Sequence, residues 1–166
     1  MVKSCIEYKY IAVCLAVILL ILVLYLIYRQ YIEHYSQNDP KLQELKEIFR
    51  NFFSKKERYW SGELEVLNNR DIMKEINLYR GDKSYTINKE NVYMCLKNND
   101  GDYYDMNTLI YVLAHEIAHV ICDEIGHTEK FHRIFEALLK ELIEEDIYNP
   151  NLKVKNDYCE NGDPEI

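Results

Sequence analysis

The stretch Ala114-His115-Glu116-Ile117-Ala118-His119 lies inside an apolar segment, and the interpretation of the whole chain depends on it. On an α-helix, residues four apart lie on the same face, so the imidazoles of His115 and His119 can reach one metal ion. Glu116 lies beside them and can serve as general base for a metal-activated water. The pattern therefore predicts a helix that carries a catalytic zinc site.

The residues around this stretch predict where its helix begins and ends. We expect a helix over about residues 107–125, capped by Asp105 or Asn107 and ended by Gly126, because glycine adopts the left-handed conformation that ends many helices. Its apolar positions recur with helical spacing, which predicts packing against a core. These positions are Leu109, Val112, Leu113, Ile117, Val120 and Ile121.

A zinc hydrolase needs three protein ligands and one open coordination position, so a third ligand is required. His127 directly follows Gly126, eight residues after His119, and a chain reversal at the glycine can return its side chain to the metal. Glu129 and His132 are the alternatives. Glu129 would lie in the first turn of a second helix, which we expect Thr128 to cap and which should end near residue 146.

The segment upstream of the motif predicts one helix and a small sheet, so the fold class is α+β. Asp39 and Pro40 are expected to begin a helix that ends near Lys55 or Lys56. Short runs rich in β-branched and aromatic residues then predict a mainly antiparallel sheet, with a hairpin turn at residues 88–91. The strand candidates, in chain order, are residues 64–67, 77–80, 84–87 and 92–96.

An uncharged apolar run of 18 residues, residues 11–28, stands near the N-terminus. As a helix it would extend about 27 Å, close to the thickness of the hydrocarbon core of a bilayer. The run ends in Tyr-Leu-Ile-Tyr-Arg rather than in small residues, so we expect an uncleaved transmembrane anchor and not a signal peptide. The expected organisation is a tail at 1–10, the anchor at 11–28, a polar linker at 29–39, a metallopeptidase-like domain at 40–147 and an irregular tail at 148–166.

Charge and cysteine content indicate which partners and which cellular compartment we expect for this chain. The formal net charge is −8 and the chain shows no basic stripe, so we expect no nucleic-acid partner. The five cysteines are odd in number and lack paired spacing, which predicts reduced thiols and places the domain on the reducing, cytosolic side of the membrane. These cysteines are Cys5, Cys14, Cys95, Cys122 and Cys159.

From His115 to Val120, and again from Gly126 to Phe131, the sequence resembles the signature of WLM and SprT-like metallopeptidases, a group of zincins. The upstream stretches from Tyr85 to Lys89 and from Tyr93 to Leu96 also resemble WLM-like proteins of large DNA viruses, and the resemblance as a whole covers about residues 75–150. It implies a small zincin-like domain that binds Zn2+ through His115, His119 and His127. It also implies that extended peptide pairs with an edge strand, for which Val92 to Leu96 is the best candidate.

We therefore expect a membrane-anchored zinc metallopeptidase with Glu116 as general base, the lipid bilayer as one partner and a protein or peptide as substrate. The alternative is a membrane-tethered, inactive protein with a structural zinc, which a fourth ligand such as Cys122 would favour. The DNA-linked role of the resembling families is not expected for an acidic, anchored chain. The candidates for stabilising an oxyanion are Tyr85, Tyr93, Tyr103, Tyr104 and His132.

Overall fold

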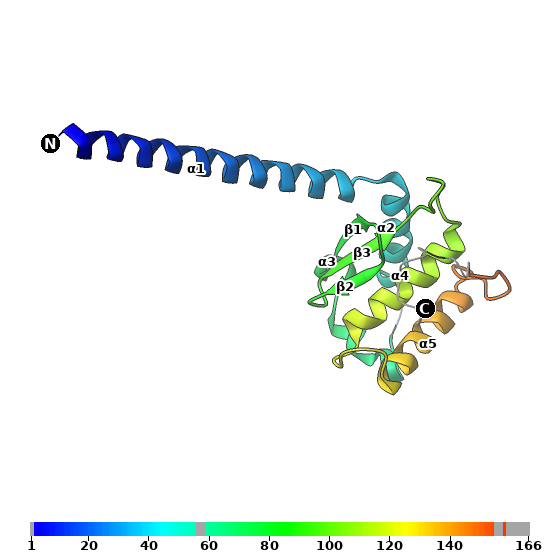
Figure 1. Ribbon diagram of the computed structural model, residues 1–166. Helices are drawn as coiled ribbons and strands as arrows, with labels where there is room; N and C mark the ends of the chain where they lie inside the picture. The colour runs from blue at the N-terminus through cyan, green and yellow to red at the C-terminus, as the bar shows by residue number, and fades with distance from the viewer. Residues whose placement is uncertain (1, 56–58, 155–157, 159–166) are drawn as a thin grey trace. The chain divides into compact units, whose positions relative to one another are not determined.

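The computed structural model describes residues 2–55, 59–154 and 158. Within these residues the chain is α+β, with six helices and one small mixed sheet of three strands. It forms two compact units, residues 1–36 and residues 37–166 (Figure 1). The second unit contains the sheet, the motif helix and the buried core.

Helix α1 (Val2–Gln37) is a single 36-residue helix. Its segment Tyr10–Tyr31 has a mean hydropathy of 3.2, and none of it is buried, so it is long and apolar enough to cross a membrane. A signal sequence satisfies the same criteria of length and composition. The helix includes most of residues 1–10 and 29–39, which were expected to be a tail and a linker. Helical structure continues because the first proline is Pro40, which disfavours helix in the residue before it.

Helix α2 (Pro40–Phe53) confirms the predicted start. The Asp39 carboxylate accepts hydrogen bonds from the backbone N–H groups of Lys41, at 2.9 Å, and Leu42, at 3.4 Å. These bonds satisfy donors that the first helical turn leaves without partners. The helix ends slightly earlier than expected and buries one face, formed by Leu42, Leu45, Phe49 and Phe52.

The segment after α2 differs from its prediction. Residues 64–67 were expected to form a strand, but they belong to the 3-10 helix η1 (Gly62–Asn69), which the short helix α3 (Ile72–Glu75) follows. The buried side chains of η1 are Leu64 and Leu67, three residues apart. A 3-10 helix has three residues per turn, so this spacing buries both leucines, whereas a strand would place them on opposite faces.

The sheet contains β1 (Asn77–Gly81), β2 (Tyr85–Ile87) and β3 (Asn91–Cys95), in the order β1-β3-β2. The predicted hairpin is confirmed, because β2 and β3 pair antiparallel. Strand β1 pairs parallel to β3, so the expectation of a mainly antiparallel sheet was wrong in one of its two pairings.

Strand β3 is the central strand, so the expectation that Val92 to Leu96 forms the edge was wrong. Val92 and Met94 are both fully buried. A strand with such a buried face is best accommodated in the middle of the sheet, where both of its edges are paired. The open edge on the hairpin side is therefore formed by β2, whose Tyr85 and Ile87 are each 42% exposed.

Helix α4 (Met106–Ile121) packs against β2, β3 and α5 (Glu129–Glu144) (Figure 1). The caps Asp105 and Thr128 are confirmed, since each side chain accepts a backbone N–H bond from the first helical turn. Helix α4 ends at Ile121, before the predicted stop at Gly126, because Cys122 adopts an extended backbone. Gly126 is left-handed, with a φ of 84°, but it lies in the following loop.

The C-terminal tail completes the second unit. Residues 148–154 and 158 contain no helix or strand, yet Tyr158 is buried and donates a hydrogen bond of 2.5 Å to the carbonyl of Cys95. Cys95 is disulfide-bonded, whereas Cys14 and Cys122 are free, so the expectation of reduced thiols throughout was wrong. The partner of Cys95 is not among the cysteines whose side chains the structure describes.

Candidate metal centre

The face of α4 that carries His115 and His119 is oriented by burial. Twelve residues of this helix are buried, including His115 at 5% exposure and Glu116 at 3%. The Asp105 carboxylate anchors the start of the helix, accepting from the backbone N–H of Thr108 at 2.9 Å and from its hydroxyl at 2.8 Å. The packed helix thereby holds both imidazoles on one side of a cavity.

Three imidazole nitrogens converge at one point. The Nε2 atom of His119 lies 3.2 Å from that of His115 and 3.1 Å from that of His127, and the remaining pair is 3.0 Å apart. Nitrogens that share a tetrahedral zinc at about 2.0–2.1 Å lie about 3.3 Å from one another. The triangle therefore has nearly the size that a bound zinc ion requires.

Of the three candidates for the third ligand, His127 is the one that the structure brings to the other two histidines. Among the described residues, the group able to hold a metal consists of His115, His119 and His127. Glu129 and His132 lie outside this group, and the ring of His132 is centred 6.3 Å from that of His127. Glycine supplies the reversal, because the left-handed Gly126 precedes the histidine and leaves open space around its Cα.

Phe131 packs against all three imidazoles from within the core. Its ring is stacked on His119, with 4.2 Å between the centroids, and is centred 4.9 Å from the rings of His115 and His127. Phe131 is fully buried on the first turn of α5. Such packing restricts the ring orientations of the ligands before any metal binds.

Burial keeps the imidazoles of His115 and His119 in the neutral form that binds metals. Burial, together with the smaller effects of the neighbouring His119 and His127, lowers the pKa of His115 to about 3. Burial likewise lowers the pKa of His119 to about 4, with His127 and Lys89 adding to the effect. At neutral pH both rings therefore offer a lone pair rather than a positive charge.

Glu116 has the environment of a general base. Burial raises the pKa of its carboxyl to about 7, although a hydrogen bond from Thr86 opposes that shift. The hydroxyl of Thr86 donates to Glu116 Oε2 at 2.7 Å. A carboxyl group with a pKa near the operating pH can both take and return a proton, which is the property that acid–base catalysis requires.

The site opens into a cavity of about 510 Å³ between the sheet edge and the motif helix. One wall comes from β2 and the turn that follows it, the floor from α4, and the other wall from the loop after α4. The lining residues include Tyr85, Thr86, Lys89, His115, Glu116, His119, Glu124, Ile125 and His127. A volume of this size is typical of a ligand-binding pocket.

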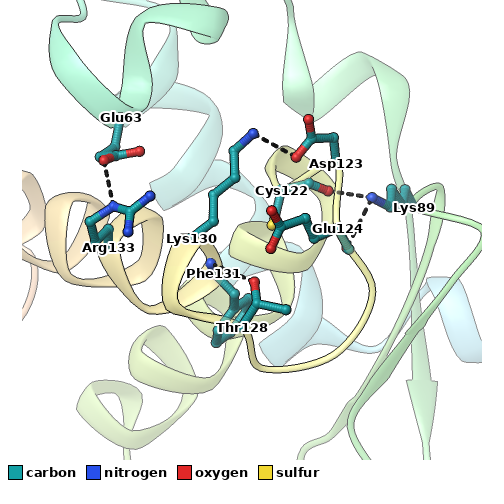
Figure 2. A network of polar contacts seen from close by, with 9 residues as sticks. All are labelled: Glu63, Lys89, Cys122, Asp123, Glu124, Thr128, Lys130, Phe131 and Arg133. Carbon is teal, nitrogen blue, oxygen red and sulfur yellow. Dashed lines mark hydrogen bonds and ion pairs between the residues drawn. The ribbon is translucent and has the colours of Figure 1, made fainter.

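The loop that carries His127 makes polar contacts on both sides (Figure 2). On the sheet side, the ammonium of Lys89 donates to the backbone carbonyls of Cys122 and, at 3.3 Å, Glu124. On the helix side, Lys130 and Asp123 form an ion pair at 2.7 Å. Thr86 and Lys89 lie in the stretch from Tyr85 to Lys89 that resembles viral WLM-like proteins, but no sequence pattern assigned either residue a role at the site.

The oxyanion candidates are separated by the fold. Tyr85 lines the cavity, and its ring stacks on Tyr93 with 4.8 Å between the centroids. Tyr103 donates a hydrogen bond to Asp39, and Tyr104 is buried against the ring of Tyr158. Of these tyrosines, Tyr85 is therefore the one that lines the cavity of the three histidines.

Comparison with known proteins finds viral relatives. No protein-family model and no solved structure matches the chain. "Uncharacterized protein 136R" of Invertebrate iridescent virus 6 is 48% identical over 103 residues, which is 60% of this chain and 58% of that protein. "Uncharacterized protein 042R" of Invertebrate iridescent virus 3 is 39% identical over 99 residues, and "Uncharacterized protein R325" of Acanthamoeba polyphaga mimivirus is 34% identical over 117. These matches cover 59% and 66% of this chain, and 62% and 58% of the two relatives. The chain thus resembles viral proteins and spans less than two thirds of the length of each of these three.

Proposed function

We propose that this chain is a membrane-anchored zinc metallopeptidase of the zincin type, similar to the WLM and SprT-like enzymes. The observation that carries the proposal is the convergence of His115, His119 and His127 beside the buried carboxyl group of Glu116, at the floor of an open cavity. Three imidazole nitrogens and an adjacent carboxylate form the donor set of a hydrolytic zinc site.

Zinc suits these donors better than the harder divalent cations. Three imidazoles favour zinc over magnesium or calcium, which prefer oxygen ligands. When bound, zinc polarises a carbonyl group and lowers the pKa of water to about 7. The cavity beside the three histidines leaves room for water and substrate, as a catalytic site requires.

Glu116 performs the proton transfers in this proposal. Its Oε2 atom accepts the Thr86 hydroxyl, and no hydrogen bond to Oε1 forms within the described part of the chain. Oε1 is therefore the atom that takes the proton of the attacking water. The same carboxyl group then returns a proton to the leaving amine, so the base is regenerated in each cycle.

The open edge of β2 suits an extended peptide substrate. This strand borders the cavity, and its outer edge remains unpaired within the described residues. A peptide that pairs with this edge would extend the sheet and place its backbone over the histidines. The substrate strand is thus proposed on β2 and not on Val92 to Leu96, which form the centre of the sheet.

Helix α1 is proposed as the uncleaved anchor of this enzyme. The side of the membrane is a separate matter, because the disulfide at Cys95 opposes the placement of the domain on the reducing side. Disulfides persist in oxidising compartments, so we propose that the domain lies on the oxidising side of the membrane. Alkylation of the full-length chain with and without a reductant measures whether Cys95 is oxidised in the membrane-bound protein.

The inactive alternative is less favoured by the site. A structural zinc is held by four protein ligands, and the Cys122 thiol, although free and buried, does not join the histidine group. The cavity beside the three nitrogens is open rather than filled by a fourth ligand. These two observations support a catalytic over a purely structural metal.

The proposal is tested with the full-length chain in detergent. We expect one zinc ion per chain, nitrogen-only protein coordination by X-ray absorption, and cleavage of a random peptide library that a chelator abolishes. His127→Ala should lose the zinc, whereas His132→Ala should retain it, since His132 lies outside the cluster. A zinc-loaded chain that cleaves no peptide would refute the peptidase, and a chain without affinity for zinc would refute the site.

A further inference from the structure

We infer that the β2–β3 hairpin (residues 85–95) positions the site from outside the motif, through Thr86 and Lys89. Thr86 fixes the carboxyl group of Glu116, and Lys89 fixes the loop that presents His127. This inference rests on the proposed peptidase for the role of Glu116. Both positioning residues lie about 30 positions away in the sequence from the groups that they hold.

Thr86 contacts Glu116 at two points. Its hydroxyl lies 2.7 Å from Oε2 and 3.3 Å from the backbone carbonyl of the same residue. Thr86 is half-buried in the middle of β2, while its neighbours Tyr85 and Ile87 are each 42% exposed. Side chains alternate along a strand, so the threonine points toward α4 as the other two face solvent.

The hydrogen bond from Thr86 restricts a rotation that burial alone leaves free. The terminal torsion of a glutamate is broad, so a carboxylate without a partner samples many orientations. A donor held on a strand selects one orientation and leaves Oε1 for the proton of the water. Valine has nearly the shape of threonine but lacks the hydroxyl, so a valine variant isolates this bond.

Lys89 is placed by a turn that needs a specific backbone. Asn88 and Lys89 both have a positive φ, 54° and 55°, and are the two central residues of a tight turn closed by the hydrogen bond from the N–H of Glu90 to the carbonyl of Ile87. Asparagine adopts this conformation readily, but lysine is uncommon there. The turn nevertheless directs the ammonium group of Lys89 onto the carbonyls of Cys122 and Glu124 (Figure 2).

These two carbonyls lie between the end of α4 and His127. Cys122 follows the last residue of α4, and Glu124 precedes His127 by three positions. The carbonyl end of a helix carries partial negative charge, so a cation stabilises it there. Lys89 therefore ties the start of the ligand loop to the hairpin and limits how far His127 can move from the other two nitrogens.

The ion pair between Lys130 and Asp123 provides a matched comparison, because it contacts the same loop from the other side. The Asp123 side chain is 73% exposed and that of Lys130 is 36% exposed. Exposed ion pairs contribute little to stability, since water and salt screen them. Loss of Lys130 should therefore perturb the metal site far less than loss of Lys89.

The positioning role of Thr86 is tested by steady-state kinetics of the full-length chain on a cleaved library peptide. We expect Thr86→Val to lower kcat about tenfold, with KM and zinc affinity unchanged, because the base is misoriented while binding is intact. Thr86→Ser restores the hydroxyl and should recover kcat to within about threefold of wild type. A valine variant with wild-type kcat, or a serine variant as impaired as valine, overturns this role. Activity of the wild-type chain in the same assay separates that outcome from a failure of the proposed function.

The positioning role of Lys89 is tested by measuring zinc affinity in a chelator competition, which requires no peptidase activity. We expect Lys89→Met to weaken zinc binding about 10- to 100-fold, the usual cost of removing a group that orients a ligand. Lys89→Arg keeps the donors and should stay near wild type, as should Lys130→Met. A methionine variant that binds zinc like wild type, or a Lys130→Met variant that loses as much affinity, overturns the role of Lys89.

Discussion

Helices α1 and α4 are both strongly apolar, but they face different surroundings. In α1, no residue of the Tyr10–Tyr31 segment is buried, whereas α4 is enclosed by the sheet and by α5. The apolar run of α1 carries no Asp, Glu, Lys, Arg or His, while α4 carries the buried His115 and Glu116 and the half-buried His119. Apolar composition therefore does not distinguish a membrane anchor from a core helix. Buried titratable groups with nearby partners distinguish the helix that carries a site.

The substitutions with the largest expected effect interrupt the apolar run of α1. Leu19→Lys combined with Leu20→Lys places two charges in the middle of the apolar run, at a cost of about 5–7 kcal/mol for membrane insertion. We expect the chain to leave the membrane fraction in carbonate extraction and flotation. The alanine pair at the same positions should remain with the membrane. Retention of the lysine variant would show that α1 is not held by the bilayer.

The substitution with the next largest expected effect removes the carboxyl group of Glu116 in α4. Glu116→Gln cannot accept a proton, so peptide cleavage should fall about 100- to 10,000-fold while zinc content stays unchanged. Glu124→Gln is the matched control, since Glu124 lines the same cavity but is exposed. The measurement is initial cleavage rate together with metal analysis. Equal rates for the Glu116 variant and wild type would remove this residue from the mechanism.

A matched pair of leucines compares the surroundings of the two helices directly. Leu113 in α4 is fully buried, whereas Leu20 in α1 is 58% exposed. Leu113→Ala should destabilise the second unit by about 2–5 kcal/mol, through lost burial and a cavity, and Leu20→Ala by about 0 kcal/mol. Thermal unfolding of both variants in detergent tests the difference. Similar shifts of the unfolding midpoint would contradict it.

The smallest effect is the response of the metal-free chain to acid. In the unfolded chain, the histidines have a pKa of 6.5. In the folded chain, the pKa is about 4 for His119 and about 3 for His115, so both stay neutral to a lower pH. Because the unfolded chain binds more protons at these two residues, lowering the pH from 6.5 to about 3 favours unfolding. Glu116 acts in the opposite sense between pH 7 and 4.5, because its folded pKa is raised to about 7. Stability should thus fall below pH 6.5, and most steeply between 4.5 and 4.

This pH dependence is measured as the unfolding midpoint of the chelator-treated chain between pH 7 and 4. His115→Gln removes one of the two depressed groups, so its midpoint should fall less than that of wild type over the same range. The difference between the two chains separates this histidine from the other acidic groups of the protein. A variant with the wild-type slope would show that His115 is not kept neutral by burial.

Local chemistry made several features predictable. The caps Asp39, Asp105 and Thr128 each bond to backbone N–H groups two or three residues away, so their roles follow from adjacent sequence. The face shared by His115 and His119 follows from helical periodicity in the same way. The strand expected at residues 64–67 failed, because two leucines three apart fit a 3-10 turn as well as a short apolar strand.

The sequence alone thus determined the motif helix, its neighbouring caps and the apolar N-terminal run, since each depends on contacts within a few residues. Only the tertiary structure decided that β3 lies in the centre of the sheet and that Thr86 and Lys89 reach the site. It also decided that His127, and not Glu129 or His132, meets the other two histidines. Such placements depend on which distant surfaces are buried together, and no local pattern encodes that choice.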